Sequence, residues 1–195
     1  MRYVALGDSY TIGTSVSAAD AWPSQLVARV PDLELVANLG VNGYTSADTI
    51  AHELPRLDAL EPEFVTLLIG VNDVVQHVPR PAYEANIETI LDELLERLEP
   101  DRVLCLATPD YTVTPQGGAF GSPRQQRAGI ERVNAILGAA CEARGVRFVP
   151  EIFAISQAAA TDRSLVAGDG LHPSGAQYAL WADAIAPVVA ELLAD

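Results

Sequence analysis

Two short motifs of this 195-residue sequence contain a serine, an aspartate and a histidine, the residue types that acyl transfer requires. Ser9 closes the motif Gly-Asp-Ser, and Asp169 and His172 belong to the motif Asp-Gly-Leu-His-Pro. A serine hydroxyl becomes a nucleophile when a histidine takes its proton, and a carboxylate orients that histidine through its other ring nitrogen. An acid three residues before a histidine in one turn can reach Nδ1 and leave Nε2 free. Ser9, Asp169 and His172 are therefore candidates for a catalytic triad.

A tetrahedral intermediate also needs hydrogen-bond donors aimed at its oxyanion. Asn72 offers a side-chain amide in the motif Gly-Val-Asn-Asp, and Gly43 offers a backbone N–H that no side chain shields. The backbone N–H of Ser9 is a third donor, and Gly40 is a weaker candidate than Gly43. Asn72, Gly43 and Ser9 are therefore the residues that we expect to form an oxyanion hole.

Each motif taken alone has a simpler structural interpretation. Asp8 and Ser9 are common helix or turn caps, glycine and asparagine are common turn residues, and an acid and a histidine can stand at a helix start without chemistry. All three motifs together arise by chance in on the order of one in 10⁵ chains of this length. Their conjunction favours catalysis, whereas His52, His77 and Asp8 keep a structural interpretation.

Short apolar runs alternate with longer segments of helical periodicity along the chain. Strands covered on both faces are continuous in apolar character, and their alternation with helices builds a parallel sheet through right-handed crossovers. The predicted strands are residues 3–6, 33–37, 64–69, 103–107 and 146–149. The predicted helices are residues 21–30, 46–60, 83–98, 124–144 and 174–193. We therefore expect an α/β fold with one parallel sheet between two helical layers, and a single domain over residues 1–195.

The candidate residues follow the predicted strands. Ligands of open α/β sheets bind beyond the carboxyl ends of the strands. Ser9 follows the first strand, Gly43 lies in the segment after the second, and Asn72 follows the third. After the fourth comes an irregular stretch, residues 108–123, rich in Thr, Gly and Pro. A loop of that length in a compact domain is typically functional or mobile.

The composition excludes several classes of partner. The formal charge is −14, and all twelve basic residues are Arg, so nucleic acid and anionic lipid are poor partners. The chain starts directly with a predicted strand and carries no apolar run of the ~18 residues that a membrane span needs, so we expect a cytoplasmic protein without a signal peptide. Cys105 and Cys141 are expected to be buried reduced thiols, with no metal site.

These motifs resemble the SGNH hydrolase superfamily, the GDSL-like lipases, acylhydrolases and esterases. The resemblance extends from Gly7 to His172, and it departs from the GDSL motif at Tyr10, where that motif has leucine. It implies a three-layer α/β/α, flavodoxin-like fold with about five parallel strands. It also implies ester hydrolysis through a Ser9 acyl-enzyme, without cofactor or metal. The substrates of the superfamily include simple esters, acetylated sugars, thioesters and lysophospholipids.

Two alternatives stay open beside the esterase. A carbohydrate-binding relative without turnover would have the same fold, although it would be expected to lack a member of the Ser/Gly/Asn/Asp/His set. A flavodoxin-like nucleotide binder would need a phosphate loop, and no Gly-x-Gly-x-x-Gly pattern follows a predicted strand. The long loop 108–123 carries mainly Thr, Gly and Pro and offers little apolar lining, so it favours short acyl or acetyl esters, whereas a thioesterase or lysophospholipase would take longer chains. The sequence leaves the natural substrate and the oligomeric state undetermined.

Overall fold

A five-stranded parallel sheet forms the centre of the computed structural model, which describes residues 1–194. Its strands are β1 (Arg2–Gly7), β2 (Glu34–Asn38), β3 (Phe64–Leu68), β4 (Val103–Leu106) and β5 (Arg147–Val149). They lie in the order β2-β1-β3-β4-β5, and all neighbours are parallel. The order is that of flavodoxin-like folds, so the predicted fold class is confirmed. Each predicted strand is found within two residues of its bounds.

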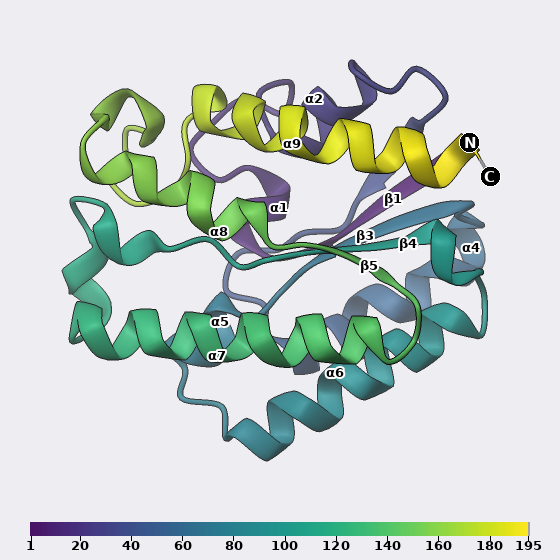
Figure 1. Cartoon of the computed structure of the whole chain (residues 1–195), viewed down its shortest axis with the longest axis horizontal. Coiled ribbons are helices and arrows are strands. Elements are labelled where there is room, and N and C mark those ends of the chain that lie inside the picture. Colours follow the sequence, from purple (N-terminus) through teal and green to yellow (C-terminus); the bar gives the residue numbers. More distant parts are fainter. Residues whose placement is uncertain (195) are drawn as a thin grey trace.

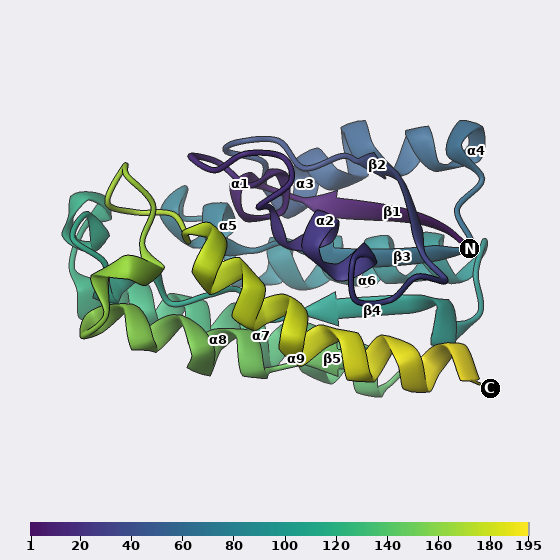
Figure 2. The ribbon, with the colours of Figure 1, turned by 90° about the horizontal axis from the view of Figure 1, so that it is seen from above.

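Helices cover both faces of the sheet, as Figure 1 shows. One layer contains α2 (Trp22–Val27), α8 (Glu151–Ser156) and α9 (Gly175–Ala194), with the short α1 (Ser9–Ile12). Figure 2 views this layer from above, with α2 beside α9. The other layer contains α3 (Ser46–Asp48), α4 (Leu57–Leu60), α5 (Val71–Val75), α6 (Arg80–Leu95) and α7 (Pro123–Glu142). The result is the three-layer α/β/α sandwich.

The strands supply both layers with apolar side chains. Successive side chains of a strand point to opposite faces of a sheet. In β1, Tyr3 and Ala5 pack in the core beneath α2 and α9, whereas Val4 and Leu6 pack in the core beneath α6 and α7. All four are fully buried. This double burial explains the continuous apolar runs that identified the strands.

The strand order places a switch point beside β1. The chain passes from β1 to β2 on one side of it and then to β3 on the other side. Gly7, the last residue of β1, is in register with Leu68, the last residue of β3. Crevices of α/β proteins open at such a point, at the carboxyl ends of the two strands. The segments that follow β1 and β3 are those of Ser9 and Asn72.

The helical predictions were wrong in two respects. The segment predicted as one helix, residues 46–60, is a chain of short turns: α3, a π-helix (Thr49–Glu53), a 3-10 turn (Leu54–Arg56) and α4. Pro55 interrupts the pattern because it lacks an N–H and disfavours helical geometry before it. The short helices α1, α5 and α8 were not predicted, because four to six residues are too few for a periodic pattern to emerge.

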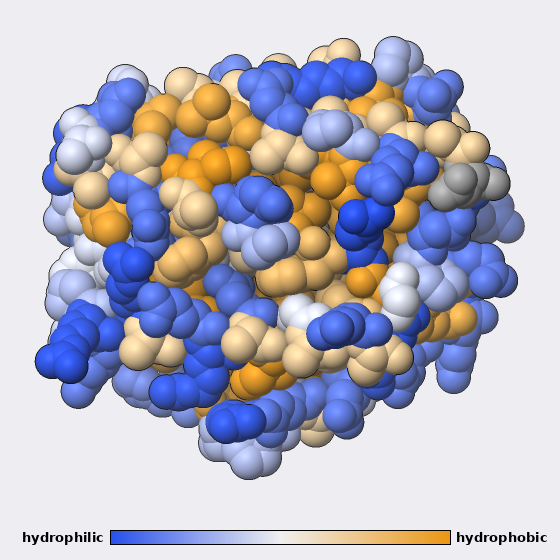
Figure 3. Space-filling model, viewed as in Figure 1, coloured by the Kyte–Doolittle hydropathy of each residue, from blue (hydrophilic) through white to orange (hydrophobic). Residues whose placement is uncertain are grey.

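Both cysteines are free and buried, as the sequence predicts. Large hydrophobic side chains with substantial exposure include Ile12, Val41 and Phe120, all near the carboxyl ends of the strands. Figure 3 shows hydrophobic residues interspersed with hydrophilic ones over the face that carries α7, α8 and α9. No helix within residues 1–194 has both the length and the apolar character that crossing a membrane requires.

Candidate active site

A tight turn after β1 presents Ser9. Gly7 has φ 149°, and a Cβ atom there would lie 2.3 Å from the carbonyl oxygen of Leu68 and 2.4 Å from Oγ1 of Thr11. Only glycine fits this turn without displacing the backbone of β3. The Asp8 side chain then caps α1 by accepting a 2.9 Å hydrogen bond from the N–H of Tyr10. Ser9 therefore stands at the first position of a helix, with its side chain at the switch point.

Two buried carboxyl groups lie beneath this turn. Asp8 is fully buried, and burial raises its pKa to about 8. Glu53, at the end of the π-helix, accepts a 2.9 Å hydrogen bond from the N–H of Gly7, and burial together with the nearby Asp8 raises its pKa to about 8. Asp8 thus caps the helix, a structural role, as the sequence indicates. Glu53 supports the backbone of the turn from the opposite layer.

Asp169 and His172 meet as the sequence predicts. Oδ2 of Asp169 lies 2.6 Å from Nδ1 of His172, and Oδ1 accepts the backbone N–H groups of Leu171 (2.9 Å) and His172 (3.0 Å). The turn is closed by a hydrogen bond from the N–H of Ala167 to the carbonyl of His172 (2.8 Å). The turn therefore fixes the carboxylate of Asp169. Of the two ring nitrogens of His172, this carboxylate contacts only Nδ1, so Nε2 makes no contact with it.

Tyr10, the residue at which the chain departs from the GDSL motif, has a packing role beside His172. Its ring is buried, with its centroid 5.5 Å from the imidazole of His172 and 6.2 Å from Trp181 of α9. Aromatic pairs at these separations attract through tilted contacts. Tyr10 therefore packs the histidine against α9 in the position where the motif has leucine.

Three side-chain hydrogen bonds tie the loop after β2 and the start of α3 to α5 and its C-cap residue Gln76. Nδ2 of Asn72 donates to the carbonyl of Tyr44 (2.9 Å), and Nε2 of Gln76 donates to the carbonyl of Gly43 (2.9 Å). The hydroxyl of Ser46 donates to Asp73 over 2.5 Å. Because an amide nitrogen has two donors, Asn72 keeps one N–H after its bond to Tyr44. These contacts place Gly43 beside Asn72.

The backbone donors expected at the oxyanion hole are unused. Within residues 1–194, the N–H groups of Ser9 and Gly43 have no acceptor in the chain. Gly43 has φ 85°, which favours glycine, and a Cβ there would meet no atom within 4 Å. Gly40 differs, because a Cβ atom on it would lie 2.7 Å from the carbonyl of Asp8. Gly40 is a packing glycine, and Gly43 is open to the site.

All the predicted residues except Asp169 line one cavity of about 180 Å³, and Asp169 is linked to that cavity through its contact with His172. Its polar lining consists of Ser9, Asn42, Gly43, Asn72 and His172. Its apolar lining comes from α1, α5 and two loops: Tyr10, Val71, Val75, Tyr111, Phe120 and Leu171. Ligand pockets typically have such an apolar wall with a few convergent polar groups. The aliphatic side chains of α5 were not expected, since the sequence suggested little apolar lining.

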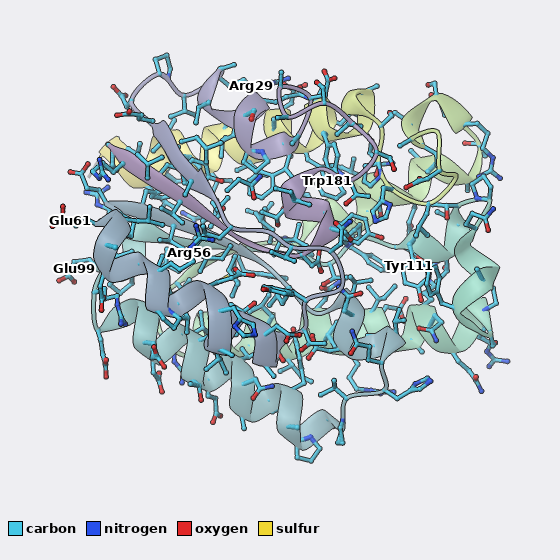
Figure 4. All side chains as sticks on the ribbon, turned by 180° about the vertical axis from the view of Figure 1, so that it is seen from behind. Arg29, Arg56, Glu61, Glu99, Tyr111 and Trp181 are labelled. Carbon is cyan, nitrogen blue, oxygen red and sulfur yellow. The ribbon has the colours of Figure 1, made fainter. Side chains whose placement is uncertain are left out.

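Residues 108–123 form one wall of this cavity. Tyr111 and Phe120 both line it, and their rings meet edge to face at 5.6 Å. Figure 4 shows Tyr111 at the end of the molecule opposite Glu61 and Glu99, where the carboxyl ends of the strands lie. Residues 111–113 and 117–120 form 3-10 turns. The long loop is therefore ordered and contributes aromatic groups to the site.

A larger hollow of about 400 Å³ lies behind α5, between α6 and α7. Asp73 and Val74 line it from α5, with Arg80 and Arg132 from the flanking helices. Its lining contains no serine, threonine or cysteine. None of the residues that the sequence singles out for acyl transfer lines this larger hollow.

A family model confirms the resemblance expected from these motifs. The model of the GDSL-like Lipase/Acylhydrolase family matches residues 5–180, which is most of the chain. The chain belongs to this family. Because the family is one of lipases and acylhydrolases, the enzyme class expected from the sequence, a carboxylic ester hydrolase, is confirmed at the level of the family.

Similar proteins include other acylhydrolases. A thioesterase 1/protease 1/lysophospholipase L1 of Escherichia coli (strain K12) is 29% identical over 89 residues, which are 46% of this chain and 43% of that protein. The match thus spans less than half the length of this relative. Among solved structures, TesA covers 98% of this chain and 99% of its own, with a TM-score of 0.76 and 20% identity. A variant of Axe2, an acetyl xylan esterase from Geobacillus stearothermophilus, covers 96% of this chain and 94% of its own, with a TM-score of 0.74 and 20% identity. Both structures share the fold of this GDSL-like chain.

Sequence reasoning missed several residues that contact the site. Ser15 donates a 2.6 Å hydrogen bond to Asp169, and Gln126 accepts one of 2.8 Å from the Tyr111 hydroxyl. No motif contains either of them. Glu53 did leave a signal, because this acidic residue stands four positions before Leu57 on the apolar face of its helical segment. A buried acid on such a face is unusual enough to be noticed.

Proposed function

We propose that this chain hydrolyses carboxylic esters of short acyl groups through a Ser9–His172–Asp169 triad and an acyl-enzyme. One observation supports the proposal most: Ser9 and His172 line the same small cavity, and Asp169 holds Nδ1 of that histidine. A nucleophile, a base and an orienting acid in this relation are the requirement for acyl transfer. The same cavity is also lined by Gly43 and Asn72, the expected donors for the oxyanion.

In the first half-reaction, Oγ of Ser9 attacks the carbonyl carbon and Nε2 of His172 takes the hydroxyl proton. The carbonyl oxygen becomes an oxyanion and accepts hydrogen bonds from the N–H groups of Ser9 and Gly43 and from the Asn72 amide. The intermediate then collapses as the bond to the alcohol oxygen breaks. The imidazolium returns its proton to that oxygen, and the alcohol leaves.

In the second half-reaction, His172 takes a proton from water, whose oxygen attacks the acyl carbon on Ser9. The bond to Oγ breaks, the proton passes from His172 to Oγ, and the carboxylic acid leaves. Asp169 stays ionised throughout, because its hydrogen bonds hold its pKa below the usual range in spite of burial. It fixes the tautomer and stabilises the imidazolium.

The size of the cavity supports short acyl groups. Its volume of about 180 Å³ is smaller than the ~300–1,000 Å³ of typical ligand pockets. Val71, Val75 and Leu171 can remove a few methyl and methylene groups from water, at ~0.8 kcal/mol each. Acetyl to butyryl groups fit this cavity, whereas the further methylene groups of a longer acyl chain would lie outside it.

A thioesterase or lysophospholipase activity on longer chains is the second candidate. The Escherichia coli relative carries these activities in its name. An open groove on the other side of Asn42 is lined by the exposed side chains of Ile12 and Val41. A long acyl chain that left the cavity past Asn42 would find apolar contacts there. The length of the preferred acyl chain separates the two candidates.

Labelling with a fluorophosphonate tests the proposal. Only an activated serine attacks this phosphorus, so intact-mass analysis should show one adduct, and peptide mapping should place it on Ser9. Ser9→Ala should abolish both the adduct and the hydrolysis of p-nitrophenyl acetate. Ser17→Ala, a change in the loop that follows α1, should leave both at wild-type levels. Turnover near wild type in Ser9→Ala would refute the assignment, and an unlabelled wild-type protein would favour a binding module without turnover.

A further inference from the structure

Asp169 receives a second side-chain hydrogen bond besides its contact with His172. The hydroxyl of Ser15, in the loop between α1 and α2, donates to Oδ2 of Asp169 over 2.6 Å. The same oxygen lies 2.6 Å from Nδ1 of His172, whereas Oδ1 accepts only backbone N–H groups. Ser15 and His172 therefore share one carboxylate oxygen, although Ser15 stands 154 positions before Asp169 in the chain.

The backbone of Ser15 is strained. Its φ is 68°, in the left-handed region that non-glycine residues rarely adopt. A glycine would adopt this conformation without strain, so a serine here keeps its hydroxyl at an energetic cost. The site therefore combines a strained residue with a short hydrogen bond to a carboxylate that the mechanism uses. This combination points to a role for the hydroxyl itself.

The Ser15 hydroxyl is one of several donors that stabilise the negative charge of Asp169. Burial raises the pKa of Asp169, but hydrogen bonds from Ser15, His172 and the backbone of Leu171 outweigh burial and hold the pKa well below its usual range. The bond from Ser15 contributes the most among the effects that lower it. A donor on Oδ2 stabilises the negative charge there and reduces the pull of that oxygen on a proton at His172.

We infer that Ser15 is a positioning residue of the hydrolytic site, which acts through Asp169: its hydroxyl moderates the charge that Oδ2 of the carboxylate presents to His172. The inference rests on the proposed function, because Ser15 acts on the reaction only through these two residues. Loss of the Ser15 hydroxyl leaves Oδ1 of Asp169 held by the N–H groups of Leu171 and His172. The carboxylate then keeps its place but binds the imidazolium more strongly, so the neutral base forms only at higher pH.

Two substitutions separate the hydroxyl from the backbone strain. Ser15→Ala removes the hydroxyl and keeps a side chain at positive φ, whereas Ser15→Gly removes both the hydroxyl and the strain. We expect both to lower kcat for p-nitrophenyl acetate by roughly 10-fold with little change in KM. We also expect the acid limb of the kcat profile to move up by about half a pH unit or more. Ser17→Ala is the matched control, because it removes a 2.7 Å bond to Asp20 in the same loop.

A readout without turnover completes the test. In a Ser9→Ala background, the Nδ1 proton of His172 should give a low-field NMR signal, and adding Ser15→Gly should move it. Wild-type pH profiles and an unmoved signal in both Ser15 variants would overturn the inference. So would full recovery in Ser15→Gly with loss in Ser15→Ala, since strain would then be the cause. Turnover in Ser9→Ala alone would instead refute the proposed function, and the NMR signal would still report on Ser15.

Discussion

The carboxyl group of Glu53 accepts a 2.9 Å hydrogen bond from the backbone N–H of Gly7, two residues before Ser9. Glu53 is 1% exposed, and its second oxygen, Oε1, has no partner within residues 1–194. The turn that presents the nucleophile is thus supported by an acid whose charged form is poorly solvated. This relation makes the stability of the fold depend on pH.

Glu53→Gln should reduce the loss of stability that accompanies a rise in pH from ~4.3 to about 8. The pKa of Glu53 is about 8 in the fold, and a glutamate in an unfolded chain titrates near ~4.3. Between these values the native state holds a proton that the unfolded state has lost, so the free energy of unfolding falls as pH rises. The slope from one such group reaches ~1.4 kcal/mol per pH unit. Glutamine can still accept the Gly7 N–H but does not titrate.

Urea denaturation at pH 5, 6.5 and 8 measures this effect. The stability of Glu53→Gln relative to wild type should increase steadily from pH 5 to pH 8. Glu99→Gln is the control, because Glu99 is exposed at the opposite end of the molecule (Figure 4). Parallel stability curves for wild type and Glu53→Gln would show that Glu53 does not titrate in this range.

Asn72→Ala should lower kcat by roughly 10²–10³, the usual effect of losing one oxyanion donor, with a smaller change in KM. The Gln76→Ala control removes the 2.9 Å bond to the Gly43 carbonyl and leaves Asn72 in place. Steady-state kinetics on p-nitrophenyl acetate compare the two. If Gln76→Ala lost as much activity as Asn72→Ala, the role of Asn72 would be to hold the loop after β2, because its amide also bonds Tyr44.

Asp169→Asn tests the orienting acid. An amide in place of the carboxylate presents the wrong hydrogen-bonding group to Nδ1 of His172, so kcat should fall by about 10³–10⁴ with the fold retained. Because its hydrogen bonds hold the pKa of Asp169 well below its usual range, the wild-type carboxylate stays charged along the whole acid limb of the pH profile. Activity should therefore rise with pH through one ionisation. A second ionisation on the acid limb would indicate that Asp169 titrates in the same range.

The sequence predicted some elements and candidate site residues and missed others, for physical reasons. Strands buried on both faces leave continuous apolar runs, so the strands were found. Ser9, Asn72 and His172 stand in local motifs, which made them candidates, and the structure brings them to one cavity. Ser15 and Gln126 act through contacts across loops, and neither spacing nor periodicity reveals such contacts. The aliphatic wall was missed because it comes from α5, whose five residues are too short for a periodic signal.

Gln126 links both aromatic residues of the long loop to α7. The Tyr111 hydroxyl donates to its Oε1 (2.8 Å), and its Nε2 donates to the carbonyl of Phe120 (2.8 Å). Gln126 itself is buried. The adjacent Arg127 contacts the buried Asp110 at 3.3 Å, at the start of the same loop. The start of α7 therefore holds the loop wall of the cavity at several points.

The wild-type protein should prefer acetyl to butyryl esters, because each methylene left outside the cavity forfeits ~0.8 kcal/mol of transfer free energy. Gln126→Leu should weaken this preference, because it leaves the Tyr111 hydroxyl without its acceptor and releases Phe120, so the loop can move away from α5. Gln125→Leu is the matched control, since Gln125 is the exposed neighbour in α7.

Values of kcat/KM for p-nitrophenyl esters of two to sixteen carbons decide the question. A wild-type maximum at ten carbons or beyond would favour the thioesterase or lysophospholipase candidate. Identical profiles for Gln126→Leu and Gln125→Leu would show that the loop wall does not set the length of the acyl chain.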